Sequence, residues 1–167
     1  MLENRRPFVG TVLGIDPSLR GTGLAVVALD SGTVARLLFS QTVRLKPSIA
    51  QSQCLAEIFR AVRAIFENFD VDQVAVEQTI YVQNLKTAMS LGAARGAAIA
   101  AVAVCDKPVF EYPPLRIKQA VVGFGRASKE QVARTVTALL RHHTELKFDE
   151  ADAAGVAICH GLTYKGG

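Results

Sequence analysis

Four acidic residues have types and positions that suit metal chemistry. Asp16 and Glu77 each end a run of apolar residues. Asp149 and Asp152 are spaced i, i+3 in an alanine-rich segment. An ionised carboxylate beside an apolar core is costly unless an opposite charge neutralises it. Hard divalent cations such as Mg²⁺ or Mn²⁺ neutralise several carboxylates at once and need no histidine ligand. The sequence therefore predicts a metal-dependent enzyme.

The same acids suit phosphodiester hydrolysis. Two ions about 3.5–4 Å apart can hold both the attacking and the leaving oxygen of a phosphodiester. Three of the acids also have a purely structural explanation: Asp16 can start a turn, Asp149 can cap a helix, and Asp152 can favour the helix dipole. Glu77 is harder to explain in this way, because strands disfavour Glu and no basic partner is nearby in the sequence.

Basic residues crowd one stretch of the sequence. A net charge of +4 and a pI near 9.1 favour a polyanionic partner but do not establish one. The stretch holds a single acid, Glu130, among five basic residues: Arg116, Lys118, Arg126, Lys129 and Arg134. A solvated helix face and a phosphate-contacting edge both explain this pattern.

Length and composition favour a single domain over residues 1–167. Half of the residues are hydrophobic, so the chain can bury a substantial core. No apolar run has the length of a membrane span, and the N-terminus lacks the apolar segment of a secretory signal. Three widely spaced cysteines fit a reducing cytosol better than a disulfide framework. We therefore expect a cytoplasmic protein with no membrane partner.

Hydrophobic periodicity predicts strands and helices in a definite order. Apolar runs bounded by turn residues predict strands over 8–16, 22–29, 33–43, 73–77 and 109–112. Helical spacing predicts helices over 47–69, 84–105, 128 to about 142, and from about 149 onward. Ser128 and Gln131 form a capping-box pattern at the start of the third helix. Pro113-Pro114 is expected to stop the last strand.

This order predicts an α/β fold with a mixed sheet. The first three strands form an antiparallel meander, and the helices between later strands require parallel crossovers. We expect a five-stranded sheet, three strands antiparallel and two parallel, flanked by helices. Sites collect at the carboxyl ends of parallel strands, where Asp16 and Glu77 would be adjacent. A helix that packs its alanine face on the sheet would present Asp149 and Asp152 to them.

Motifs along nearly the whole chain match those of one enzyme family in their order. The matching segments are 14–18 with 22–23, 75–78, 91–96, 109–112, 117–123, 129–132 and 149–158. The first reads Gly-Ile-Asp-Pro-Ser, and the last contains Asp149-x-x-Asp152. Any one motif is modest evidence, but the ordered set is very specific. The sequence resembles the RuvC family of Holliday junction resolvases.

The resemblance implies a ribonuclease H-like fold and an endonuclease that resolves four-way DNA junctions by paired symmetric nicks in recombination and repair. It implies that catalysis and the binding of two Mg²⁺ ions, with Mn²⁺ as a substitute, fall to Asp16, Glu77, Asp149 and Asp152. It also implies a homodimer, whose two-fold axis presents two active sites to a two-fold junction, with the helix from Asn84 in the interface. The general base, the cleavage preference and a branch-migration motor protein as a further partner stay open.

The resemblance also suggests which residues contact DNA. The family often has Phe in the loop after Glu77, where this chain has Ile80 followed by Tyr81. Tyr81 can offer a stacking face to a base, and both residues can equally be core or interface residues. Two lysines match basic residues that the family uses near the scissile phosphate, and two arginines share their stretch. The expected DNA contacts are Lys118, Lys129, Arg116, Arg126, Ile80 and Tyr81.

Three alternatives remain at the level of the sequence. An actin-like ATPase shares an Asp-Gly-Thr pattern near a first strand, but it needs two related domains and a second glycine-rich loop. A YqgF-type or other ribonuclease H-like nuclease has a similar first strand. The Asp149-x-x-Asp152 ending and the segment 91–96 argue against it. A non-catalytic junction-binding dimer is the third alternative, against which the presence of all four acids speaks.

Overall fold

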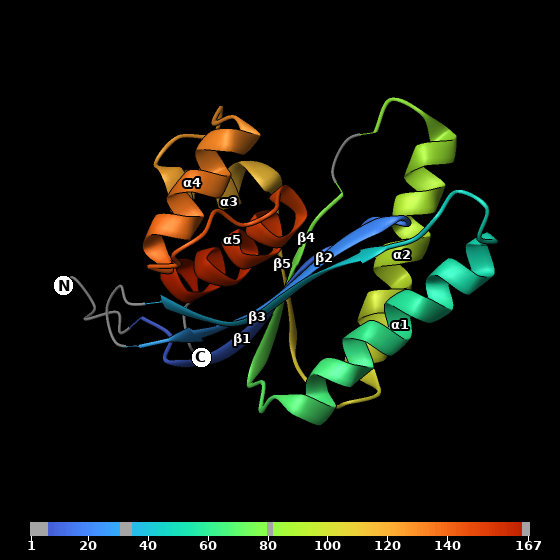
Figure 1. The fold of residues 1–167 in the computed structure, drawn as a ribbon, viewed down its shortest axis with the longest axis horizontal. Coiled ribbons are helices and arrows are strands. Elements are labelled where there is room, and N and C mark those ends of the chain that lie inside the picture. The colour runs from blue at the N-terminus through green and yellow to red at the C-terminus, as the bar shows by residue number, and fades with distance from the viewer. Residues whose placement is uncertain (1–6, 31–34, 80–81, 165–167) are drawn as a thin grey trace.

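Five strands form one sheet in the order β3-β2-β1-β4-β5 in the computed structural model, which describes residues 7–30, 35–79 and 82–164 (Figure 1). The strands are β1 (Gly10–Asp16), β2 (Gly21–Leu29), β3 (Ala35–Arg44), β4 (Gln73–Glu77) and β5 (Val109–Tyr112). Neighbours among β1, β2 and β3 are antiparallel, whereas β4 pairs in parallel with both β1 and β5. The predicted α/β fold with a mixed sheet is confirmed.

Helices cover both faces of the sheet (Figure 1). They are α1 (Gln51–Asn68), α2 (Leu85–Ala103), α3 (Pro114–Val122), α4 (Lys129–Leu139) and α5 (Phe148–Thr163). The core under α1 and α2 contains Leu13 and Ile15 of β1, both fully buried. The core under α3, α4 and α5 contains Val12 of the same strand. Successive residues of β1 enter opposite cores, because side chains of a strand alternate between its two faces.

One helix was missing from the predicted order. β5 does end at Tyr112, but Pro114 is the first residue of α3 and not part of a loop. The first residue of a helix needs no amide donor, and proline already has a helical φ, so proline starts a helix readily. The order is therefore β-β-β-α-β-α-β-α-α-α.

The other element boundaries follow the sequence closely. β4 and β5 span the predicted residues, and the Ser128–Gln131 capping box is present at the start of α4. Lys147 is the N-cap of α5, which places Asp149 inside the first turn, so the explanation of Asp149 as a cap is wrong. Within the three described ranges, no helix has both the length and the apolar character needed to cross a membrane.

A buried histidine joins α5 to β4 and β5. His160 is fully buried, and its ring nitrogens contact the Tyr112 hydroxyl at 2.8 Å and the Gln73 side-chain oxygen at 2.6 Å. The rings of Phe110 and Tyr164 each lie 4.8 Å from the His160 ring. Burial lowers the pKa of His160 to about 4, so the ring is neutral at pH 7.

This low pKa predicts that acid weakens the fold. The unfolded chain protonates His160 near its ordinary pKa of about 6.5, whereas the folded chain does so only near pH 4. Between these values the unfolded state binds more protons, so the free energy of unfolding falls as the pH falls. We expect His160 to cause about 2 kcal/mol of the loss between pH 7 and pH 5. Urea unfolding at both pH values measures it, and an equal loss in His160→Gln would contradict the prediction.

Candidate active site

Asp16 and Glu77 lie side by side because their strands are parallel neighbours. Ile15 of β1 pairs with Val76 of β4, so the next residue of each strand is an acid at the same edge of the sheet. Both acids are partly buried, and the charge of Glu77 adds to burial in raising the pKa of Asp16.

Two glycines let α5 bring its own acids to this edge. A Cβ atom at Gly14 of β1 would lie 1.9 Å from the carbonyl oxygen of Ala153, and one at Gly23 of β2 would lie 2.0 Å from that of Asp149. Only a residue without a side chain allows a helix backbone so close to a strand. Small residues on α5 are buried, and Ala153 and Ala157 are the ones whose backbone lies against Gly14. Asp149 and Asp152 therefore start their helix beside the strand ends.

A pocket of about 220 Å³ opens between the strand ends and the helices α3, α4 and α5. Its lining joins three acids to two lysines and three apolar residues: Asp16, Glu77, Asp152, Lys118, Lys129, Pro114, Ile117 and Val132. Asp149 does not line this pocket, but its charge raises the pKa of both Asp16 and Asp152. The structure thus brings three of the four predicted acids into one pocket and places the fourth beside it.

Burial and mutual repulsion raise the pKa of the acids in the pocket. Burial is the largest cause at Asp16, whose pKa lies well above its ordinary value, and the Glu77 charge follows. Burial and the charge of Asp152 also raise the pKa of Glu77, although Lys118 and Lys129 oppose them. The pKa of Asp152 is raised chiefly by burial. Three carboxyl groups face two ammonium groups, so the lining lacks positive charge when all three are ionised.

This donor set fits a hard divalent cation. Carboxylate oxygens are the ligands that Mg²⁺ and Mn²⁺ prefer, and a cation would relieve the repulsion that raises the pKa of Asp16. Among the residues that the structure describes, no three Asp, Glu, His or Cys side chains stand close enough to form a ready ligand set. The acids therefore surround the pocket loosely, and their side chains would have to turn toward a shared ion.

Two of the predicted basic residues reach the acids. Lys118 of α3 and Lys129, the first residue of α4, both line the pocket. Arg116 and Arg126 are exposed and are not part of its lining. Residues two apart on a helix point in different directions, which separates Arg116 from Lys118. The remaining predicted DNA contacts lie outside the described residues: Ile80 and Tyr81.

The apolar wall of the pocket was not predicted. Pro114 and Ile117 belong to α3, the helix missing from the predicted order, and Val132 lies in α4. The spacing of Pro114, Ile117 and Val121 at i, i+3 and i+7 was the available signal for a helix that packs on one side. Ile117 and Val121 are indeed its buried residues.

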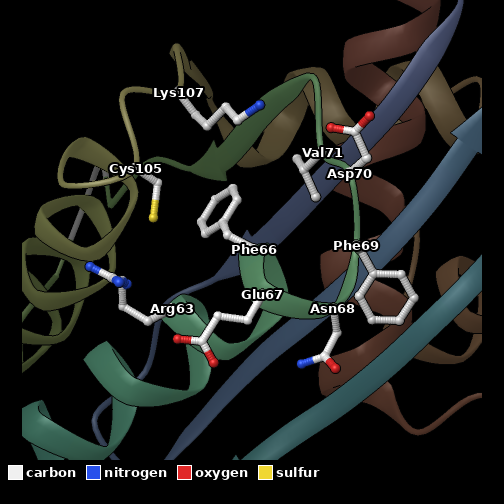
Figure 2. A pocket seen from close by; sticks show the side chains of 9 residues that line it. All are labelled: Arg63, Phe66, Glu67, Asn68, Phe69, Asp70, Val71, Cys105 and Lys107. Atoms are coloured by element: carbon white, nitrogen blue, oxygen red, sulfur yellow. The ribbon is translucent and has the colours of Figure 1, made fainter.

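A second pocket, of about 520 Å³, lies at the other end of β4 (Figure 2). Its lining comes from the end of α1, the segment that leads into β4, and the segment between α2 and β5. Figure 2 shows Arg63 and Lys107 reaching it from different segments, with Glu67 and Asp70 also in the lining. The basic side chains of this pocket lie at the opposite end of β4 from Glu77. Its residues therefore provide controls for the acid pocket.

The mixed sheet, with acids at the ends of β1 and β4, defines a ribonuclease H-like enzyme. A protein-family model for crossover junction endodeoxyribonuclease RuvC matches residues 12–160. The chain therefore belongs to the RuvC family, as its motifs predicted, and not to the YqgF type.

Individual relatives agree with this assignment. Crossover junction endodeoxyribonuclease RuvC of Halorhodospira halophila is 43% identical over 149 residues, which cover 89% of this chain and 88% of the relative. The protein of the same name from Moorella thermoacetica is 40% identical over 150 residues, 89% of each chain. The structure of T. thermophilus RuvC in complex with Holliday junction substrate matches with a TM-score of 0.86 and 32% identity, over 92% of this chain and 93% of that one. The yeast mitochondrial resolvase Ydc2, at 11% identity and a TM-score of 0.64, shares the fold.

The contact at Gly14 predicts a large effect of one added methyl group. Gly14→Ala would force α5 away from β1, because the new Cβ would overlap the Ala153 carbonyl. Overpacking of this kind costs about 1–3 kcal/mol or more of unfolding free energy, which urea denaturation measures. Gly155→Ala in α5 is the matched control, because a Cβ there would lie 3.5 Å from its nearest neighbour, an ordinary van der Waals contact. We expect the control to be neutral or slightly stabilising. Equal unfolding midpoints for the two variants would contradict the proposed close contact.

Proposed function

We propose that this chain is a structure-selective endodeoxyribonuclease that resolves four-way DNA junctions by paired symmetric nicks in recombination and repair. The observation that carries this proposal is the pocket in which Asp16, Glu77 and Asp152 face Lys118 and Lys129. Membership of the RuvC family and the likeness to a RuvC in complex with Holliday junction substrate support it. We propose that residues 1–167 act as one nuclease domain in the cytoplasm, where three free cysteines remain reduced.

We infer that the acids hold two Mg²⁺ ions, with Mn²⁺ as a substitute, through Asp16, Glu77, Asp149 and Asp152. Bound there, the ions would supply an acidified water and charge stabilisation of the leaving 3′-oxygen. The side chains of Lys118 and Lys129 add positive charge on the α3 and α4 side of the pocket, where a phosphate would enter. Such fixed charges orient the DNA backbone without reading its sequence.

An exposed apolar stripe on α2 supports a homodimer through that helix. Leu85 and Met89 are 78% and 66% exposed, and Gly92 and Gly96 continue the same face with open space beside them. Residues spaced i, i+4, i+7 and i+11 lie along one side of a helix. Large apolar side chains exposed in a row favour contact with another protein. A second copy of α2 packed there would relate two acid pockets by a two-fold axis, as a two-fold junction requires.

The central prediction concerns cleavage of a labelled four-way junction and of matching duplex DNA. We expect symmetric nicks in the junction with Mg²⁺, none with chelator, and little cutting of the duplex. Asp16→Asn should lower the cleavage rate by about a thousandfold, or about 4 kcal/mol in the barrier, because it removes one charged oxygen from the ion site. Equal cutting of duplex would contradict junction selectivity. Binding without cutting in any divalent metal would favour an architectural dimer.

Lys118 is expected to position the phosphate. Lys118→Ala should slow single-turnover cleavage by about 10–100-fold, the worth of one charge-assisted contact. Lys107→Ala removes a cation from the pocket of Figure 2, at the other end of β4, and is the matched control. The control should cleave at a rate within about twofold of the parent, since a charge at the far end of β4 is screened from DNA bound at the acid pocket. If Lys118→Ala cleaves as fast as the Lys107→Ala control, Lys118 does not position the phosphate.

A further inference from the structure

Glu150 stands between the two acids of α5 in the sequence, but its side chain turns to β3. The Ser40 hydroxyl donates a hydrogen bond to Glu150 Oε2 at 2.8 Å, and the Thr42 hydroxyl lies 3.5 Å from Oε1. The Lys147 ammonium is 3.8 Å from Oε1, and the Glu150 side chain is only 12% exposed. Ser40 and Thr42 are two apart on β3, so they share one face of that strand.

The charge of Glu150 is directed away from the acid pocket. Its two carboxylate oxygens lie beside the hydroxyl groups of Ser40 and Thr42 on β3. Glu150 is also not part of the pocket lining. Its carboxylate therefore serves a different contact from those of its neighbours, and that contact is with the edge strand of the sheet.

The first turn of α5 needs such a contact. Its N-cap residue, Lys147, makes no side-chain capping hydrogen bond. Uncapped first turns fray, because their amide groups lack partners. Gly23 seats the backbone of this turn on β2, and Thr42 pairs with Gly23 in the neighbouring strand β3. The Gly23 contact fixes how closely the turn approaches β2. The Glu150 contact with Ser40 and Thr42 fixes its position relative to β3.

We propose that Glu150 is a positioning residue that locks the first turn of α5 to β3 and so directs Asp149 and Asp152 toward Asp16 and Glu77. The inference rests on the proposed function, in which these acids bind divalent cations. Glu150 acts through its neighbours and holds no ion itself. Residues that orient metal ligands typically change metal affinity by about 10–100-fold when they are lost.

The test is Mn²⁺ binding, followed by the electron paramagnetic resonance of the free ion, with unfolding midpoints measured in parallel. Glu150→Ala should weaken Mn²⁺ binding by about tenfold. The double variant Ser40→Ala with Thr42→Val should weaken it similarly from the other side of the contact. Combining all three changes should add little, because they break one interaction. Glu150→Gln keeps an oxygen that accepts from Ser40 and should restore binding to near the parent value.

Glu145→Ala is the matched control, because it removes an exposed acid just before α5. Its Mn²⁺ affinity should equal that of the parent. Glu150→Ala with a lower unfolding midpoint but unchanged Mn²⁺ affinity would show a merely structural residue and overturn the proposal. So would unchanged affinity in the Ser40 and Thr42 double variant. If the parent binds no Mn²⁺, or if Asp16→Asn leaves binding intact, the proposed function itself fails, and that result is distinct from either of the others.

Discussion

The contact between the backbone of α5 and strands β1 and β2 determines whether the acids meet. Strand pairing alone makes Asp16 and Glu77 adjacent. Asp152 lines the same pocket only because the backbone of α5 packs so closely on the strands. Gly14 and Gly23 make this approach possible, since a Cβ at either would overlap a carbonyl oxygen of the helix. A side chain at either position would separate the strand acids from the helix acids.

That close packing has an electrostatic cost. It holds partly buried carboxyl groups together and raises the pKa of Asp16, Glu77 and Asp152. Lys118 and Lys129 offset part of the repulsion, and the fully buried apolar cores on both faces of the sheet hold the arrangement in place. Sites that hold like charges together in this way are poised to bind a cation, whose charge reverses the penalty.

Much of this arrangement could be predicted from the sequence, and the rest depends on packing. Apolar runs bounded by turns located β4 and β5, and the parallel order of β1 and β4 placed Asp16 beside Glu77. A Pro-Pro pair ends a strand and starts a helix equally well, so α3 was missed. Charge clustering could not tell Lys118 from Arg116, because that choice depends on how α3 packs. The role of Glu150 needs β3, more than a hundred residues away in the chain.

Crystals of the protein soaked in Mn²⁺ and measured by anomalous scattering test most directly whether the α5 contact builds a metal site. The prediction is anomalous density in the acid pocket, within ligand distance of Asp16, Glu77 and Asp152, and its loss in crystals of Asp16→Asn. Density only elsewhere on the protein, or none in the pocket at saturating Mn²⁺, would contradict the claim that these acids are gathered to bind metal.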